Sequence, residues 1–170
     1  MGAHHAADAR RIRCAVVTVS DTRTPDNDTS GNEIRSRLEA AGHVVVASKI
    51  VRDEAALVRR EIEQHAASGL VDAVLLTGGT GIAARDTTFE AISTLLTKTI
   101  DGFGELFRML SYEEIGSAAM LSRAVAGLCG EMAVFSMPGS TAACRLAMEK
   151  LIVPQLPHLV GLAGAGGPAT

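Results

Sequence analysis

Apolar runs rich in β-branched residues alternate along this chain with segments whose apolar residues recur at helical spacing. The runs that predict strands span residues 12–19, 44–51, 71–76 and 132–137. The segments between them predict amphipathic helices, because apolar side chains three or four positions apart share one helix face. Parallel strands must be joined by crossover helices. This order therefore predicts an α/β fold with a mostly parallel sheet covered on both faces.

Residues that start helices support this division of the chain. The pairs Ser30–Glu33 and Thr87–Glu90 match the capping-box spacing that marks a helix start. Ser140 or Thr141 is expected to cap the terminal helix. Residues 102–116 are less regular, and their apolar side chains predict a short helix followed by a second one.

Length and composition predict a single domain. The chain has 170 residues, of which 47% are hydrophobic and only 3% aromatic, so the core must be built from Ala, Val, Leu and Ile. We expect this domain to span residues 12–160. Residues 1–11 are expected to form a flexible arm, and the Gly- and Ala-rich residues 161–170 a flexible tail.

Charge and apolar patterning exclude several functional classes. The net charge is −3 with both signs interspersed, which argues against a nucleic-acid partner. No run reaches the roughly 18 apolar residues that span a bilayer, so no membrane partner is expected. Cys14, Cys129 and Cys144 are widely separated and show no metal-ligand or disulfide pattern. They are typical of buried thiols in a reducing cytoplasm.

A glycine-rich loop follows the third predicted strand. Thr77-Gly78-Gly79-Thr80-Gly81 has three glycines in four positions, which lets the backbone turn tightly and bring N–H groups against a ligand. Such a loop is typical of a main-chain phosphate cradle. Asp86, five residues beyond Gly81, could hold a hard cation against the same phosphate. The alternative is that the glycines serve only a turn between strand and helix.

The carboxyl ends of parallel strands form one edge of a sheet, and ligands of such sheets bind there. Polar and glycine-containing segments follow each predicted strand. They are Ser20-Asp21, Asp53, residues 77–86 and Pro138-Gly139-Ser140. We therefore expect these segments, which are far apart in the sequence, to form one site.

Two other glycine motifs offer alternative interpretations of this loop. The loop is not a Walker A element, because no Gly-Lys-[Ser/Thr] follows it. Residues 79–84 do match G-x-G-x-x-A, the dinucleotide-binding fingerprint, although they follow the third strand rather than the first. A nicotinamide-dependent oxidoreductase is therefore an alternative hypothesis.

Four motifs in sequence order resemble those of the molybdenum cofactor biosynthesis MoaB/Mog family. The glycine loop with Arg85-Asp86-Thr87-Thr88 is the first. The others are Gly102 to Arg108, Leu121-Ser122-Arg123-Ala124 and Met137 to Thr141. The resemblance runs from about Ile12 to Leu156, which is nearly the whole predicted domain.

The resemblance implies a three-layer α/β/α sandwich, assembled as a trimer or a dimer of trimers, that acts late in cofactor assembly. Active members transfer AMP from Mg-ATP to the phosphate of molybdopterin and release pyrophosphate. The family positions that act in this reaction correspond to Asp53, Asp86 and Ser122, with both aspartates as Mg²⁺ ligands. Glu105 and Arg123 are further candidates for substrate binding, together with the rim segments, and other proteins of the pathway are candidate partners.

Two departures from the family pattern leave the reaction open. Adenylylating members often carry Pro-Gly-Asn-Pro after the last strand, whereas this chain has Pro138-Gly139-Ser140-Thr141, as in the MoaB branch. Asp101 also stands where the family often has Pro. A noncatalytic molybdopterin-binding or delivery protein is therefore the alternative to an adenylyltransferase.

Overall fold

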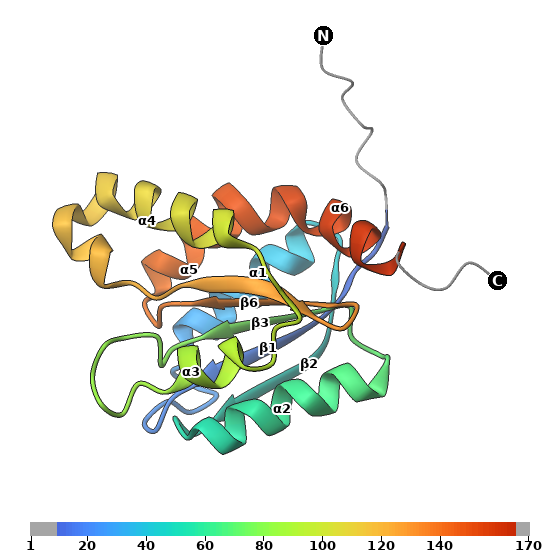
Figure 1. The fold of residues 1–170 in the computed structure, drawn as a ribbon, viewed down its shortest axis with the longest axis horizontal. Coiled ribbons are helices and arrows are strands. Elements are labelled where there is room, and N and C mark those ends of the chain that lie inside the picture. Colours follow the sequence, from blue (N-terminus) through green and yellow to red (C-terminus); the bar gives the residue numbers. More distant parts are fainter. Residues whose placement is uncertain (1–9, 166–170) are drawn as a thin grey trace, which may run out of the picture.

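The computed structural model describes residues 10–165, and within them six strands form a single sheet (Figure 1). The strands are β1 (Arg13–Val19), β2 (Val44–Val51), β3 (Ala73–Thr77), β4 (Lys98–Thr99), β5 (Val125–Cys129) and β6 (Met132–Met137). Their order across the sheet is β2-β1-β3-β6-β5-β4. The four strands from β2 to β6 are parallel, and β5 and β4 are antiparallel additions at one edge.

Helices cover both faces of this sheet, which confirms the predicted three-layer α/β/α sandwich. The helical segments are α1 (Thr29–Ala40), α2 (Ala55–Ser68), α3 (Thr88–Ser93), α4 (Asp101–Ile115), the 3₁₀ segment η1 (Gly116–Leu121), α5 (Thr141–Ala147), the π-helical segment η2 (Met148–Ile152) and α6 (Val153–Gly164). Figure 1 shows α1, α4, α5 and α6 on one face and α2 and α3 on the other. None of the helices within residues 10–165 is long and apolar enough to cross a membrane.

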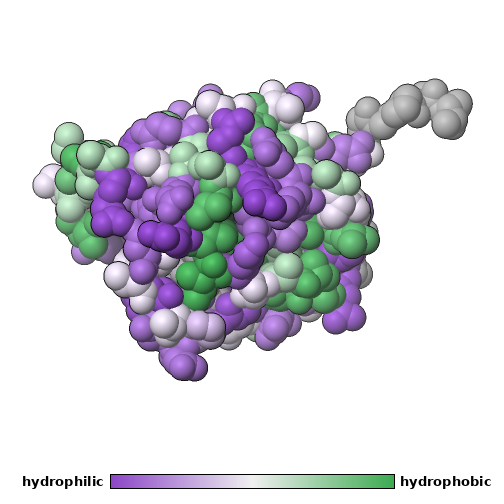
Figure 2. All heavy atoms as spheres, turned by 90° about the horizontal axis from the view of Figure 1, so that it is seen from below, coloured by the Kyte–Doolittle hydropathy of each residue, from purple (hydrophilic) through white to green (hydrophobic). Residues whose placement is uncertain are grey.

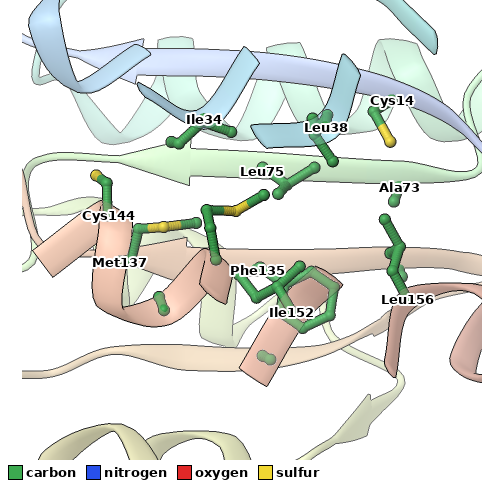
Figure 3. Close-up of a cluster of buried hydrophobic side chains, with 14 of the residues drawn as sticks. Cys14, Ile34, Leu38, Ala73, Leu75, Phe135, Met137, Cys144, Ile152 and Leu156 are labelled. Carbon is green, nitrogen blue, oxygen red and sulfur yellow. The ribbon is translucent and has the colours of Figure 1, made fainter. Parts of the chain in front are cut away.

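Each face of the sheet has its own hydrophobic core. In β1, Cys14 and Val16 pack on the α1 side, and Ala15 and Val17 pack on the α2 side. All four side chains are buried. Figure 3 shows the first core, where side chains from α1 meet side chains of β3 and β6. Because successive strand side chains point to opposite faces, a strand covered on both sides reads as a continuous apolar run.

The antiparallel edge of the sheet was not predicted. β4 has only two residues, and β5 carries Gly127 in its middle. A Cβ on Gly127 would lie 2.2 Å from the carbonyl oxygen of Lys98, so the glycine permits β4 to approach. The turn from β5 to β6 has just two residues, beginning with Gly130 at φ 62°. This two-residue, glycine-containing turn is a hairpin signal that could have revealed β5.

The two predicted capping boxes are wrong. α1 begins one residue before Ser30, and Asp28 caps it by accepting a hydrogen bond from the N–H of Gly31 (3.0 Å). The Ser30 hydroxyl instead donates to the carbonyl of Gly139 (2.7 Å). Thr87 caps α3 only by position, without a side-chain hydrogen bond to the helix. The third prediction is confirmed, because Ser140 accepts from the N–H of Ala143 (3.2 Å).

Two helices are longer than predicted. Residues 101–115 form the single helix α4 instead of two short ones. Its buried Phe103 and Phe107 pack against the sheet. This packing stabilises one continuous helix although the apolar spacing of the segment is irregular. α6 extends through Gly164, so the first four residues of the predicted tail are helical. Residues 1–9 of the predicted arm and residues 166–170 of the predicted tail lie outside the described residues.

A buried histidine makes the stability of this fold depend on pH. His43, at the start of β2, is 7% exposed, and its Nδ1 accepts a hydrogen bond from the N–H of Ile12 (3.4 Å). Burial lowers the pKa of His43 below its usual 6.5. The unfolded chain therefore takes up a proton near pH 6.5 while the folded chain does not. Stability is full above this pH and is lost as the pH falls below it.

We expect the Tm to fall by several degrees as the pH is lowered from about 7 to about 5, in part through His43. His43→Gln keeps an acceptor for the N–H of Ile12 and does not titrate, so it should flatten this profile. Calorimetry at several pH values measures the effect, with the exposed His158→Gln as the matched control. An unchanged pH profile in His43→Gln would show that this histidine is not the titrating group.

Candidate functional site

The glycine loop and the loop after β6 lie side by side at the carboxyl ends of the central strands. The N–H of Gly78 donates to the carbonyl of Met137 (3.1 Å). The buried hydroxyl of Thr77 donates to the carbonyl of Pro138 (2.9 Å). A Cβ on Gly139 would lie 3.3 Å from the Cα of Gly78, so the two backbones are in close contact. These bonds place two segments 61 residues apart on one rim.

Gly78 and Gly79 are required by the backbone as well as by any ligand. Both have positive φ, 100° and 65°, a region that glycine adopts freely. A Cβ on Gly78 would lie 2.2 Å from the carbonyl oxygen of Val19, and one on Gly79 would lie 2.1 Å from Oγ1 of Thr88. The turn hypothesis is therefore correct as far as it goes.

The backbone N–H groups of residues 79–82 have no protein acceptor. Within residues 10–165, none of these four consecutive groups donates a hydrogen bond to another protein group. Consecutive unpaired N–H groups in a glycine-containing loop are well suited to bind an anion. The loop is thus both a tight turn and a candidate anion cradle.

A cavity of about 380 Å³ brings most of the predicted segments together. One wall is formed by Gly78 to Gly81 with Asp86, and another by Ser122 and by Pro138 to Ser140. The third wall was not predicted. It is formed by residues of α4 and η1, namely Phe107, Ser111, Ile115, Ala118 and Leu121. Their apolar spacing indicated only a helix, because nothing in the sequence shows which helix end covers the rim.

Asp53 and Asp86 lie next to different residues of the glycine loop, Gly79 and Gly81. Asp53 precedes α2, and its Oδ1 faces the N–H (3.5 Å) and the hydroxyl (3.4 Å) of Thr87. A Cβ on Gly79 would lie 3.1 Å from this same oxygen. Asp86 accepts a hydrogen bond from the N–H of Ala83 (3.0 Å) and lines the cavity. Asp53 is therefore next to Gly79 and Thr87, whereas Asp86 lines the cavity.

The electrostatics of this pair favour a cation. Partial burial raises the pKa of Asp53, and the negative charge of Asp86 raises it further, while the hydrogen bonds from Thr87 lower it. Within residues 10–165 no group of three His, Cys, Asp or Glu side chains could hold a metal ion. Two carboxylates suffice for Mg²⁺, which usually keeps several waters and binds substrate phosphates. The residues present therefore fit a magnesium ion that is shared with a phosphate.

One buried hydroxyl at this site has no partner. Oγ1 of Thr88 is fully buried behind Gly79 and, among the described residues, makes no hydrogen bond. Thr88 was part of a recognised motif but was not predicted as a site residue. Unsatisfied buried polar groups are uncommon in folded proteins and often mark functional sites.

Several predicted site residues lie outside this cavity. The hydroxyl of Ser20 accepts hydrogen bonds from the N–H groups of Thr22 and Arg23, and thereby stabilises a turn. Asp21 forms an ion pair with Arg85 and accepts from the N–H of Asp53 (3.2 Å). Ser20 and Asp21 line a separate cavity next to β2. Their contacts support the loops around the site rather than its interior.

Glu105 and Arg123 line a neighbouring cavity of about 480 Å³. Ser122 belongs to the walls of both cavities, so the two are adjacent. Glu105 is exposed on α4. Arg123 forms an ion pair with Glu90 and donates to backbone carbonyls of the glycine loop. Arg123 therefore contacts the loop from outside the first cavity.

The cysteines show no sign of nucleophilic chemistry. All three are free. Burial raises the pKa of Cys14 to about 12 and that of Cys144 to about 11. The Sγ of Cys144 lies 3.1 Å from Oγ1 of Thr77 inside the first core. A thiol with such a pKa stays protonated near neutral pH, so these residues act as small apolar side chains.

The surface on the α2 side shows no continuous patch of one kind. Hydrophobic residues form small groups there, separated by hydrophilic residues (Figure 2). This mixed surface accords with the interspersed charges of the sequence.

Comparison with known proteins gives a consistent family assignment. The family profile described as "Probable molybdopterin binding domain" matches residues 15–158. The molybdenum cofactor biosynthesis protein B of Bacillus subtilis (strain 168) is 55% identical over 150 residues, which cover 88% of each chain. The corresponding protein of Staphylococcus carnosus (strain TM300) is 51% identical over 154 residues, covering 89% of this chain and 90% of that one.

Solved structures agree with this assignment. A crystal structure of a molybdenum cofactor biosynthesis protein B shares 50% identity and a TM-score of 0.90, covering 92% of this chain and 98% of the other. The tungsten cofactor synthesizing protein MoaB from Pyrococcus furiosus shares 38% identity and a TM-score of 0.80, covering 91% and 98%. The fold, the site motifs and these relatives lead to one conclusion: the chain belongs to the family of molybdopterin-binding domains that includes the molybdenum cofactor biosynthesis proteins B.

Proposed function

We propose that this protein acts in molybdenum cofactor biosynthesis by binding molybdopterin and transferring AMP from Mg-ATP to its phosphate. The observation that carries the proposal is the row of N–H groups at residues 79–82 that have no acceptor within residues 10–165, of which residues 79–81 line one cavity together with Asp86. An anion cradle next to a candidate cation site is the arrangement that a reaction between two phosphates requires.

The chemistry assigns a role to each group. The N–H groups of residues 79–82 hold the molybdopterin phosphate, and the hydroxyl of Ser122 donates to one of its oxygens. Asp86 and Asp53 would together hold Mg²⁺. The ion, when bound, neutralises charge on the phosphates. An oxygen of the molybdopterin phosphate attacks the α-phosphorus of ATP, a new P–O bond forms, and the bond to the pyrophosphate leaving group breaks. The residues act by positioning and electrostatics.

The first experiment measures pyrophosphate release with molybdopterin, ATP and Mg²⁺. We expect turnover by the unmodified protein, and a loss on the order of 100-fold or more in Asp86→Asn, because the variant cannot supply the anionic oxygen that Mg²⁺ requires. Asp26→Asn, an exposed aspartate in the loop after β1, is the matched control and should retain activity. Full activity of Asp86→Asn would exclude the role of Asp86 as a metal ligand.

The noncatalytic alternative predicts a different result in the same assay. Pro138-Gly139-Ser140-Thr141, which differs from the motif of adenylylating relatives, is the observation that favours it. Tight molybdopterin binding without pyrophosphate release would establish a binding or delivery function. The nicotinamide hypothesis predicts a fluorescence change of NADH on titration, and no such change is expected here.

The electrostatic conflict at the site predicts an effect on stability. The pKa of Asp53 is raised on folding, so its ionised form destabilises the folded chain once the pH exceeds the usual aspartate value. Asp53→Asn removes this charge and keeps an oxygen that can accept from Thr87. We expect a higher Tm at neutral pH together with loss of activity, as is common for residues selected for function. A lower Tm at neutral pH would contradict the assigned cause of the pKa shift.

We further propose that the protein forms homo-oligomers through α4 and η1. Leu106, Met109, Tyr112 and Ile115 recur every three residues along α4, and all four side chains are 47–63% exposed. Met120 and Leu121 of η1 are also exposed. These exposed apolar residues wind around half of the helix, and an exposed apolar surface of this kind is typical of a protein–protein interface. The family resemblance predicts a trimer or a dimer of trimers.

Sedimentation should therefore show oligomers for the unmodified chain and monomers for Met109→Glu, because a buried carboxylate opposes association. Val46→Glu, which changes an exposed apolar residue on the edge strand β2, is the control and should not alter the assembly. Oligomers of unchanged size in Met109→Glu would exclude α4 from the interface.

A further inference from the structure

Arg123 is directed at the backbone of the loop between β3 and α3. Its Nε donates to the carbonyl of Thr80 (3.4 Å), and its Nη2 donates to the carbonyls of Gly81 (2.5 Å) and Asp86 (3.1 Å). We propose that Arg123 is a positioning residue, which fixes this loop so that its free N–H groups and both candidate acids take their places. This inference rests on the proposed function for its kinetic consequence, and on geometry alone for its effect on the loop.

Two side chains of α3 hold the guanidinium in place. Glu90 forms an ion pair with Nη1 and also accepts from Nη2 (3.4 Å). The ring of Phe89 lies beneath the guanidinium, with its centroid 5.0 Å from Cζ. The side chain of Arg123 is only 25% exposed. A planar cation with several fixed donors suits this arrangement, and the single ammonium of lysine cannot reproduce it.

Peptide geometry carries the effect of Arg123 across the loop. In a planar trans peptide the C=O and the next N–H point in opposite directions. Because the carbonyls of Thr80 and Gly81 point at Arg123, the N–H groups of Gly81 and Ile82 point away from it. These are two of the N–H groups without a protein acceptor. Arg123 therefore fixes the orientation of half of the proposed anion cradle.

The same rule connects Arg123 to both acids. The carbonyl of Asp86 accepts from Arg123, so the N–H of the next residue, Thr87, points the other way, towards Oδ1 of Asp53 (3.5 Å). A single peptide unit thus joins Arg123 to the backbone of one candidate metal ligand and to the carboxylate of the other. Loss of Arg123 should release both acids without removing either one.

This role differs from the direct substrate binding that was predicted for Arg123 from the sequence. A direct phosphate ligand would need donors free of protein acceptors. Here Nε, Nη1 and Nη2 each contact an acceptor of the protein, so most of the five N–H donors are already engaged. A positioning role should therefore appear mainly in kcat and in the Mg²⁺ requirement, whereas direct binding would appear mainly in KM.

The test compares Arg123→Gln and Arg123→Lys in the adenylylation assay. We expect Arg123→Gln to lower kcat on the order of 100-fold and to raise the Mg²⁺ concentration for half-maximal rate, with KM for molybdopterin within about threefold. Arg123→Lys keeps the charge but not the three carbonyl contacts, so it should restore only part of kcat. Arg60→Gln, an exposed arginine on α2, is the control for the change in charge.

Three kinetic results would overturn the proposal. An unchanged kcat in Arg123→Gln would show that the loop does not depend on the guanidinium. A KM raised tenfold or more at constant kcat would show direct substrate binding instead. Full restoration by Arg123→Lys would reduce the role of the residue to its charge.

A second measurement separates this proposal from the proposed function. Amide hydrogen exchange at the hydrogen-bonded N–H groups of residues 83 and 86–88 should be faster in Arg123→Gln than in the unmodified chain and in Arg60→Gln, whether or not the protein turns over ATP. Faster exchange in a protein that releases no pyrophosphate would support the positioning role and exclude the adenylyltransferase. Unchanged exchange would overturn the positioning role, even in an active enzyme.

Discussion

Close backbone contact at the carboxyl ends of β1, β3 and β6 organises the site. Gly78 lies against the carbonyl of Val19 at the end of β1 and beside Gly139 after β6. The buried hydroxyl of Thr77 ties the same point to Pro138. Side chains at Gly78 or Gly79 would push these segments apart. The loops that follow β3 and β6 can therefore form one cavity only because their backbones touch.

Arg123 supplies hydrogen-bond donors to the carbonyl groups of the glycine loop, whereas several N–H groups of the loop stay without an acceptor within residues 10–165. A turn with two positive φ angles leaves the N–H groups of residues 79–82 without protein acceptors, and its carbonyls must find donors elsewhere. Arg123 supplies donors to the carbonyls of Thr80, Gly81 and Asp86. The molecule thus satisfies the acceptors of the loop and leaves its donors free, which creates a local preference for anions in a chain of net charge −3.

Charge repulsion is retained where the proposed chemistry needs it. Partial burial and the negative charge of Asp86 raise the pKa of Asp53, and the hydrogen bonds from Thr87 offset this effect only in part. The hydroxyl of Thr88, which makes no hydrogen bond within residues 10–165, also lies next to Gly79. Folded proteins usually eliminate such features. Their concentration beside an anion cradle supports a role in binding rather than in folding.

Sequence patterns predicted the central part of the fold because the physical reason is local. A strand buried on both faces is apolar along nearly its whole length, as in residues 73–76, and a helix that covers a sheet must have an apolar stripe. The carboxyl-end rule then placed Thr80, Asp86 and Pro138 on one rim without any structure, whereas Ser122 was predicted from the family resemblance. The short strands β4 and β5 escaped prediction, because two residues and a central glycine carry no periodic signal.

Side-chain partners were decided only by the tertiary structure. Ser30 and Thr87 have the spacing of helix caps, yet Ser30 bonds to Gly139, and Thr87 faces Asp53. Arg123 lies in a recognisable motif, but no local pattern shows that it reaches three carbonyls some 40 residues away. The sequence by itself determined the layers, the parallel strands of the core and the rim that carries the site. The direction of each polar group, and hence its role, depends on neighbours distant in the chain.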